Sequence, residues 1–489
     1  MDLDPELCYR AVRSRDRRFD GRFFTAVLTT GVYCRPVCPA PTPQRKNVRF
    51  FACASAAEEA GFRACLRCRP EASPGTPAWA GPSATVSRAL RLIAAGALDE
   101  DGIERLAVRL GVGSRHLRRL FDLELGASPV AIAQTRRAHF ARRLLDETRL
   151  PVTEIAAVAG FRSVRRFNDV MRRSFGRSPR ELRRGNAPRA AEAAAGGLSL
   201  KLPFRPPYHW SAMIRFLGDR AVPGIERVID GRFARTFECD GAAGVIEVGP
   251  VPGEPYLELR AAAPPRALIG IIERARRVFD CGADPLRIAE DLSRDRTMAR
   301  LAAEYPGLRV PGAWDGFELA VRAVLGQQIT VKGAATVAGR LAAAFGRPLG
   351  ADARERLTHL FPRPQDLINA DLASIGIPRA RAEALRALAR NVHEGRISLD
   401  VGGGPADPVL RLLELPGFGR WTAGYIAMRA LGEPDAYPWG DLGLRRAPAL
   451  GGGPLSANEL QRRAEGWRPW RAYATLLLWT NAATGGTKR

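Results

Sequence analysis

Four of the eight cysteines fall in two closely spaced pairs, a spacing typical of a metal site. The pairs are Cys34-x3-Cys38 and Cys65-x2-Cys68. Four thiolates at such spacing satisfy the tetrahedral coordination that Zn²⁺ prefers. Two interpretations stay open here. The zinc ion only staples a small domain, or it also keeps one sulfur as a reactive thiolate near neutral pH, where a free thiol of pKa about 8.5 is mostly protonated.

The other cysteines lack ligand spacing, and we expect them to be packing residues: Cys8, Cys53, Cys239 and Cys281. Eight cysteines in a chain of 489 residues do not make a disulfide scaffold. In a reducing cytosol such cysteines are more often metal ligands or nucleophiles. The cysteine usage therefore favours a zinc centre over disulfide bonds.

A second chemical signal is the segment from Leu415 to Ala423, which reads Leu-Pro-Gly-Phe-Gly-Arg-Trp-Thr-Ala and lies between two short apolar helical stretches. A Pro-Gly-x-Gly turn leaves successive backbone N–H groups free at a helix N-terminus, which is a cradle for an anion. A DNA phosphate held by Leu415, Gly417 and Gly419 fits this pattern. The turn alone also occurs in hairpins that bind DNA without catalysis.

The charge of the chain indicates a polyanionic partner. The formal net charge is +24 and the pI about 10.8, which suits nucleic acid. No apolar run approaches the roughly 18 residues that a transmembrane helix needs, and the N-terminus has no apolar signal core. These features favour double-stranded DNA as partner, exclude a membrane role and place the protein in the cytoplasm.

Two Ala-, Gly- and Pro-rich stretches, Glu71–Ser83 and Ala187–Gly197, are expected linkers. Between them, Ile103–Ser114 is echoed by Val152–Ser163; each segment has an apolar helical face, then Gly, then a Ser suited to cap the next helix. This near-repeat predicts two helix-turn-helix units.

The part of the chain after the second linker changes its pattern along its length. It begins with strand-like alternation at Val245–Val248 and Tyr256–Leu259, and it turns helical from about Pro311 to Thr480. The predicted fold class is multidomain and mainly α: a small α/β zinc domain, a helical double helix-turn-helix, a mixed α/β subdomain and an all-α domain that contains the Leu415–Ala423 turn.

The residues around the cysteines resemble the N-terminal domain of the Ada adaptive-response family. The resemblance rests on the stretches Arg15–Phe24, Thr29–Pro39 and Gly61–Pro70 and predicts a domain over residues 1–75. It implies that Zn²⁺ is bound by all four cysteines and that Cys34 accepts a methyl group from a DNA methylphosphotriester. Methylation would reduce the formal charge of the site from −2 to −1, which lessens its repulsion of phosphate and makes a switch for DNA binding.

Residues 84–186 resemble the DNA-binding domain of AraC-type activators, through Ser114–Phe121 and Ser163–Phe175 followed by Gly176-x-Ser-Pro179. The resemblance implies two recognition helices in successive major-groove segments and RNA polymerase as a further partner. Four arginines lie near the helix starts, where operator bases are contacted: Arg115, Arg118, Arg165 and Arg166. Bidentate contacts to guanine and contacts to phosphate both stay open for each of them.

The last part resembles the AlkA-type 3-methyladenine glycosylases of the helix-hairpin-helix superfamily, with an α/β domain over 198–300 and the glycosylase domain over 301–484. Tyr437–Leu444 matches the place of the catalytic aspartate, which is Asp441 here, and Gly326–Thr330 matches the loop whose wedge residue is Gln328. The implied base pocket consists of Trp421, Tyr425, Trp479 and Phe216. Plain core packing is the alternative for each of these aromatic residues.

The scarcity of lysine bears on the reaction type. The chain has only Lys46, Lys201, Lys332 and Lys488, so no amine for a Schiff base lies in the hairpin or near Asp441. Related glycosylases that cut the strand carry their lysine at the position of Trp421. The expected enzyme is therefore monofunctional, and it needs no cofactor, because no cysteine follows Cys281 for an iron–sulfur loop.

The sequence as a whole predicts a bacterial, nucleoid-associated monomer that repairs alkylated DNA and senses methylphosphotriesters. No Pro-Cys-His-Arg motif is present, so the guanine-O6 methyltransferase half of Ada is missing. The alternative function is a transcription regulator whose glycosylase part is inactive.

Overall fold

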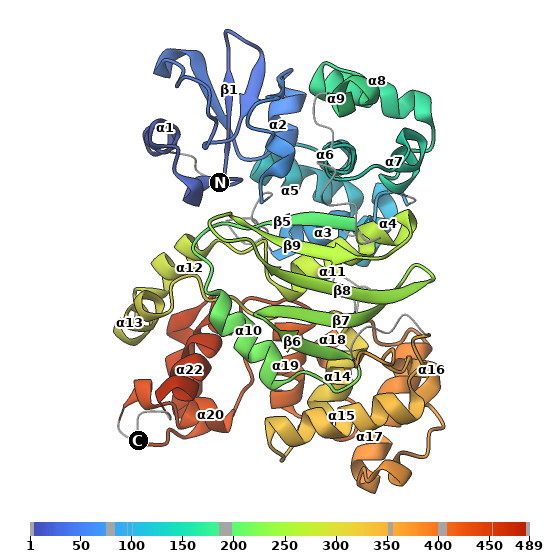
Figure 1. Ribbon diagram of the computed structural model, residues 1–489. Helices are drawn as coiled ribbons and strands as arrows, with labels where there is room; N and C mark the ends of the chain where they lie inside the picture. Colours follow the sequence, from blue (N-terminus) through green and yellow to red (C-terminus); the bar gives the residue numbers. More distant parts are fainter. Residues whose placement is uncertain are drawn as a thin grey trace. The chain divides into compact units, whose positions relative to one another are not determined.

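The computed structural model describes residues 4–74, 84–94, 96–99, 101–184, 198–350, 356–399, 408–451 and 453–485. They form two compact units (Figure 1): Met1–Pro206 with Val251–Glu273 and Cys281–Asp284, and Pro207–Pro250 with Arg274–Asp280 and Pro285–Arg489. Both units combine helices with small sheets, and the predicted multidomain, mainly α class is confirmed.

The N-terminal part of the first unit is a four-stranded sheet in the order β3-β1-β2-β4. Strand β1 is antiparallel to β2 and β3, and β4 runs parallel to β2, with Thr25 opposite Cys34. The register places Cys34 at the end of β2, where the chain leaves the sheet. The elements are α1 (Pro5–Ser14), η1 (Arg17–Phe19), β1 (Phe24–Val27), β2 (Val32–Cys34), η2 (Arg45–Asn47), β3 (Val48–Phe51), α2 (Ala54–Glu59), β4 (Arg63–Ala64) and η3 (Pro70–Ala72).

The expected linker at Glu71–Ser83 is wrong at its start. Glu71 is buried in η3, and its carboxylate accepts a hydrogen bond from Arg69 Nε at 3.1 Å. An ion pair of this kind keeps a charged residue inside a fold, which composition alone does not reveal. Residues 75–83 and the second expected linker, 187–197, lie outside the described residues.

Seven helices follow among the described residues of the first unit (Figure 1). Helix α6 contacts α3, which precedes the first helix-turn-helix, and also contacts α7, α8 and α9. The pairs α4–α5 and α7–α8 are the two predicted helix-turn-helix units. The helices are α3 (Ala84–Ala94), α4 (Ile103–Arg109), α5 (Ser114–Leu125), α6 (Pro129–Glu147), α7 (Val152–Val158), α8 (Val164–Phe175) and α9 (Pro179–Arg184).

One of the two predicted serine caps is present. Ser163 precedes α8, and its side chain accepts a hydrogen bond from Arg166 N at 3.2 Å. The cap expected at Ser114 is wrong, because Gly113 occupies the N-cap position and Ser114 is already the first residue of α5. A side chain caps the free N–H groups of the first turn from the N-cap position, and a serine that is already the first helical residue no longer occupies that position.

The first unit also contains the antiparallel pair β5 (Leu198–Pro203) and β9 (Tyr256–Ala261), followed by η5 (Pro265–Ala267). The second unit contains the antiparallel ribbon β6 (Glu226–Ile229), β7 (Arg232–Cys239) and β8 (Ala242–Pro250). The two strands predicted from sequence alternation are confirmed as parts of β8 and β9.

Helices make up the remainder of the second unit. Buried side chains of α14, α15, α17 and α19 share one core, which includes Leu325, Leu341, Leu385 and Ile426. This core supports α19, the helix that follows the Pro-Gly-x-Gly turn. The helices are α10 (Trp210–Asp219), α12 (Pro285–Leu292), α13 (Arg296–Glu304), α14 (Gly316–Leu325), α15 (Val331–Phe345), α16 (Pro364–Leu367), η6 (Leu372–Ile375), α17 (Arg379–His393), α18 (Pro408–Leu413), α19 (Arg420–Arg429), α20 (Leu442–Arg445), η7 (Pro448–Leu450), α21 (Ala457–Ala464), η8 (Glu465–Trp467) and α22 (Arg471–Gly485), while α11 (Leu268–Val278) has residues in both units.

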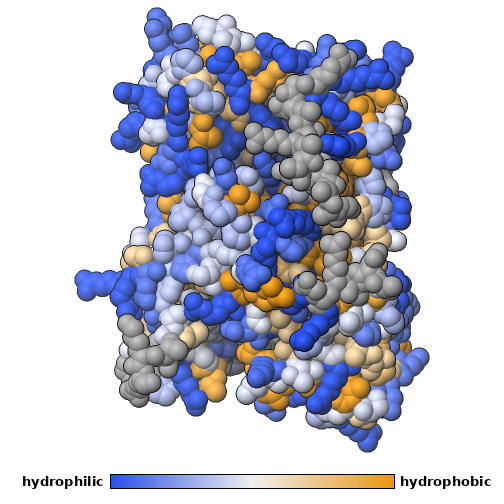
Figure 2. Space-filling model, viewed as in Figure 1, coloured by the Kyte–Doolittle hydropathy of each residue, from blue (hydrophilic) through white to orange (hydrophobic). Residues whose placement is uncertain are grey.

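The surface carries many charged and polar side chains. Figure 2 shows hydrophilic side chains over much of the visible face, with apolar side chains in smaller patches. Among the described helices, none combines the length and the apolar character needed to cross a membrane.

Candidate functional site

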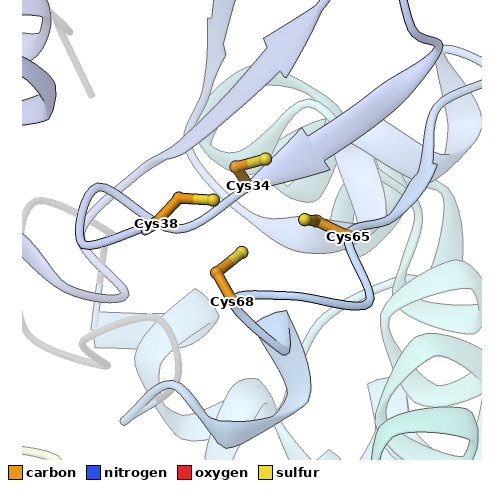
Figure 3. Close-up of side chains that lie close together, drawn as sticks. All are labelled: Cys34, Cys38, Cys65 and Cys68. Carbon is orange, nitrogen blue, oxygen red and sulfur yellow. The ribbon is translucent and has the colours of Figure 1, made fainter. Parts of the chain in front are cut away.

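The four paired cysteines converge in the first unit. Their sulfur atoms point toward one another (Figure 3), and all lie within 4.8 Å of one another. Zn–S bonds of about 2.3 Å in a tetrahedron place the sulfur atoms roughly 3.8 Å apart, which is within this limit. Cys34 ends β2, Cys38 follows in the next turn, and Cys65 and Cys68 follow β4. The donor set and its geometry fit Zn²⁺.

The surroundings of the cluster also fit bound thiolates. The backbone N–H of Arg35 donates to Cys68 Sγ at 3.3 Å, and the Arg35 side chain is held by the Asp20 carboxylate and by Cys68 O at 3.1 Å. Hydrogen bonds among the crowded sulfur atoms raise the pKa of Cys34 and Cys68 and lower the pKa of Cys38 and Cys65. Four thiolates this close together would repel one another, so a bound cation is needed for all four sulfur atoms to be thiolates at once.

The exposure of the sulfur ligands differs. Cys34 is 8% exposed, whereas Cys38 is the most exposed of the four. Exposure by itself therefore points to Cys38 as the sulfur that solvent or DNA reaches first. The assignment of the methyl acceptor to Cys34 rests on the family resemblance and stays a prediction.

The four operator-binding candidates are exposed on two helices. Arg115 and Arg118 lie in the first turns of α5, and Arg165 and Arg166 lie in the first turn of α8. The apolar faces behind them are buried, with Leu117 and Phe167 fully enclosed. Each helix therefore presents its arginines outward, as DNA contact requires.

In the second unit, the carboxylate of Asp441 is held by three neutral donors. Trp421 Nε1 donates to Oδ2 at 2.7 Å, Trp479 Nε1 donates to Oδ1 at 3.0 Å, and Leu444 N donates to Oδ1 at 2.8 Å. Asp441 is also the N-cap of α20. No arginine, lysine or histidine forms an ion pair with it among the described residues. The three donors therefore fix the carboxylate without cancelling its charge.

Four aromatic side chains line the space beside Asp441. Trp421 and Tyr425 stand one turn apart on α19 and stack at 5.3 Å with an interplanar angle of 6°. Tyr425 and Trp479 are 6.3 Å apart, and Phe216 of α10 lies 6.5 Å from Trp479 at 21°. All four predicted pocket residues therefore come together, although only Trp421 and Tyr425 are close to each other in the chain. A flat base fits against such walls.

The predicted phosphate-binding hairpin lies between α18 and α19. Gly417 adopts a left-handed backbone (φ 79°), and a Cβ there would lie 3.1 Å from Ala384 Cβ. Gly419 is the N-cap of α19, and no side chain caps the helix. Gly417 and Gly419 are exposed and Leu415 is partly buried. The uncapped N–H groups are therefore free to bind an anion.

The predicted wedge residue Gln328 is exposed and has a left-handed backbone with φ 61°. A non-glycine residue in this region costs free energy, and such residues gather at functional sites. The neighbouring Gln327 connects this loop with the hairpin, because its Nε2 donates to Gly417 O at 2.9 Å and to Thr422 Oγ1 at 3.0 Å. Its side chain therefore ties the wedge loop to the start of α19.

Three residues of this site were missed by sequence reasoning: Gln327, Arg220 and Arg429. Arg429 follows Trp421 and Tyr425 at a spacing of four residues, so all three share one face of α19. That spacing was the available signal. The place of Gln327 and Arg220 in the site depends on contacts that only the folded structure shows, so the sequence offered no signal for them.

Comparison with known protein families gives four matches along the chain. Residues 7–71 match the "Metal binding domain of Ada", and residues 106–185 match a "Helix-turn-helix domain". Residues 199–315 match the "AlkA N-terminal domain", and residues 321–471 match the "HhH-GPD superfamily base excision DNA repair protein" family. The resemblances drawn from the sequence are confirmed.

Individual relatives cover the chain in whole or in part. A protein of Mycobacterium tuberculosis (strain CDC 1551 / Oshkosh), described as "Probable bifunctional transcriptional activator/DNA repair enzyme AlkA", is 45% identical over 98% of this chain and 97% of its own length. "DNA-3-methyladenine glycosylase 2" of Escherichia coli K12 is 35% identical over 57% of this chain and 95% of its own length. "Bifunctional transcriptional activator/DNA repair enzyme Ada" of the same strain is 38% identical over 31% of this chain and 42% of its own length.

Proposed function

This chain belongs to the family of bifunctional transcriptional activator/DNA repair enzymes represented by its M. tuberculosis relative, and from that membership we propose that it excises alkylated purines of the 3-methyladenine type from DNA. The observation that carries the proposal is the Asp441 carboxylate, fixed by two indole N–H groups beside the Trp421–Tyr425 stack. The N-terminal parts regulate transcription in response to methylated DNA.

The proposed chemistry is hydrolysis of the N-glycosidic bond. As the base leaves with the bonding electrons, positive charge develops on the sugar, and the fixed Asp441 carboxylate stabilises that charge. The same carboxylate orients the attacking water, whose oxygen bonds the sugar carbon, and accepts the proton that this water loses. The hairpin around Gly417 and Gly419 holds a phosphate, Gln328 enters the gap that the flipped nucleotide leaves, and the aromatic walls receive the base.

We propose that the reaction stops at the abasic site. Strand cleavage by this class of enzyme needs an amine that forms a Schiff base with the sugar. Trp421 stands where related lyases carry that lysine, and the four lysines of the chain lie outside the hairpin and the Asp441 segment. The glycosylase needs no cofactor.

A base-release assay tests this function directly. The full chain is incubated with duplex DNA that contains 3-methyladenine, and free base and strand integrity are measured. We expect released 3-methyladenine, an intact strand and breaks only after alkaline treatment of the product. Absence of release from every alkylated duplex would leave the alternative, a regulator with an inactive glycosylase part.

For the zinc part we propose methyl transfer from a methylphosphotriester to Cys34. The Cys34 sulfur attacks the methyl carbon, an S–C bond forms, the C–O bond of the triester breaks, and the phosphodiester anion leaves. Zn²⁺, bound by the four cysteines, supplies an acidic centre that keeps the attacking sulfur a thiolate at neutral pH. The site then carries one negative charge less, which favours binding of operator DNA by α5 and α8.

We assign the proposed activities to four parts of the chain: the methyl acceptor to residues 1–75, operator binding to 84–186, the α/β domain to 198–300 and base excision to 301–484. The four family matches fall within or across these ranges. Duplex DNA, damaged or operator, is the partner of all of them; RNA polymerase is the partner proposed for activation, and the protein acts as a monomer.

A further inference from the structure

The wedge loop, Gly326–Thr330, is short and is fixed at both ends by helices. Helix α14 ends directly before the loop and α15 begins directly after it. Thr330 caps α15, because its Oγ1 accepts a hydrogen bond from Gly333 N at 3.1 Å. Gln328 lies at the centre of the loop, exposed and with a left-handed backbone (φ 61°). The strained backbone therefore belongs to a residue that the loop presents to solvent.

Two further contacts hold the residue that precedes Gln328. The Gln327 side chain donates from Nε2 to Gly417 O at 2.9 Å and to Thr422 Oγ1 at 3.0 Å. The Gln327 carbonyl oxygen accepts a hydrogen bond from Arg381 Nη2 of α17 at 2.7 Å. A left-handed backbone at a residue other than glycine persists only where the surrounding structure enforces it. Gln327 and Arg381 supply that constraint, and they connect the wedge loop with the hairpin and with α17.

The chemistry of Arg381 suits it to this contact. Its guanidinium is half-buried and forms no ion pair among the described residues, whereas Arg379 of the same helix pairs with Glu383 at 3.1 Å. The carbonyl group that it binds lies just beyond the last residue of α14, where the helix dipole is negative. A hydrogen bond from a charged donor to such a carbonyl group is stronger than one from a neutral donor. Arg381 therefore fixes the end of α14 from which the wedge loop starts.

We propose that Gln327 and Arg381 are positioning residues for nucleotide flipping, because they hold the wedge loop in the conformation in which Gln328 enters the duplex. This inference rests on the proposed function and concerns the step before excision. A loop that is ordered in advance loses no further conformational freedom when the duplex binds, which makes flipping more favourable. Neither residue forms a hydrogen bond with Asp441, whose donors are Trp421, Trp479 and the Leu444 backbone. Loss of either residue should therefore leave the chemical step in place.

The pairing state of the lesion separates flipping from chemistry. Extrusion of a paired base requires the loss of its pairing and stacking, whereas an unpaired base leaves the stack more easily. A lesion opposite thymine therefore depends on the wedge loop more strongly than the same lesion opposite an abasic-site analogue. The chemical step at the sugar is the same for both duplexes. The ratio of the two release rates thus reports on the wedge loop alone.

The test measures single-turnover release of 3-methyladenine from these two duplexes by the full chain. Gln327→Met keeps the length of the side chain and removes the donor; it should slow release about tenfold or more opposite thymine and less than about threefold opposite the abasic-site analogue. Arg381→Gln should change the ratio in the same direction, and Arg381→Lys, which keeps a charged donor, should restore most of it. In the same duplexes, 2-aminopurine beside the lesion should brighten less with Gln327→Met than with wild type, because its fluorescence rises as the stack opens.

Arg386 supplies the control on the same helix. Its guanidinium also binds a backbone carbonyl group, with Nε at 3.2 Å and Nη2 at 2.7 Å from Ala370 O, but outside the wedge loop. Arg386→Gln should leave the ratio of the two rates as in the wild type. An equal fall on both duplexes in Gln327→Met, or no fall on either, would overturn the inference and leave the glycosylase function standing. Wild-type protein that releases no base from either duplex would instead reject the proposed function.

Discussion

Replacement of Asp441 by asparagine removes one charge and leaves most of the site in place. The asparagine Oδ1 can still accept from Leu444 N and Trp479 Nε1, as the aspartate Oδ1 does at 2.8 Å and 3.0 Å. Its Nδ2 then faces Trp421 Nε1, which donates to Oδ2 in the native site at 2.7 Å. Two donors meet there, so one of them loses its partner, at a cost of about 1–3 kcal/mol in stability.

The expected loss of activity is larger than this cost in stability. A carboxylate roughly 4 Å from a unit positive charge contributes about 4 kcal/mol at an effective dielectric constant of about 20. Since about 1.4 kcal/mol corresponds to a factor of ten, the charge on Asp441 accounts for about a 10³-fold increase in the rate of base release. Asp441→Asn should therefore release 3-methyladenine about a thousandfold more slowly in single turnover while the protein still binds damaged duplex.

Asp295 offers a matched control within the same unit. Its Oδ1 caps α13 by accepting from Thr297 N at 2.8 Å and Met298 N at 3.0 Å, and its Oδ2 accepts from Trp467 Nε1 at 3.2 Å. In Asp295→Asn the amide Nδ2 faces Trp467 Nε1, so two hydrogen-bond donors again oppose each other, but outside the proposed pocket. This variant should therefore lose a similar amount of stability and little activity. The reasoning fails if Asp441→Asn keeps more than a tenth of the wild-type rate, or if both variants lose activity equally.

Three further predictions concern other parts of the chain. After incubation with methylphosphotriester DNA, peptide mass spectrometry should find one methyl group on Cys34, and methyl on the more exposed Cys38 would refute the assignment. Borohydride added during base release should trap no protein–DNA adduct, and a trapped adduct would show that an amine attacks the sugar. Burial raises the pKa of Asp280 from 3.8 to about 6, so its contribution to stability is present at low pH and lost as the pH rises through about 6. The pH dependence of unfolding should therefore differ between wild type and Asp280→Asn by up to about 3 kcal/mol between pH 4 and 8, with the variant favoured at high pH; equal slopes in urea titrations would contradict this.

The sequence predicted the parts of this molecule that local pattern determines. Cysteine spacing predicted a cluster whose sulfur atoms do meet, and helical periodicity predicted both helix-turn-helix units, because each depends on residues close in the chain. Family motifs pointed to Asp441 and the aromatic pocket. The details of helix starts were less predictable: at Ser114 the helix begins one residue earlier than a serine cap requires.

What the sequence did not predict depends on contacts between distant segments. Arg220 follows α10, and Arg429 ends α19, yet both guanidinium groups lie on the Phe216 ring. Glu71 is another case: the composition of its segment suggests a linker, but Glu71 is buried and forms an ion pair of 3.8 Å with Arg142 of the distant helix α6. A charged side chain is predicted to be exposed unless its partner is known, and no local pattern names a partner far away in the chain.

The identity of the donors to Asp441 explains why aromatic residues dominate this site. A lysine or arginine partner would hold the carboxylate equally well, but it would cancel the negative charge that the sugar cation needs. An indole N–H is neutral, so Trp421 and Trp479 can fix both oxygen atoms at 2.7 Å and 3.0 Å and leave the charge in place. The same two rings form walls of the proposed base pocket. In the proposed reaction, each tryptophan thereby couples the position of the base to the position of the carboxylate.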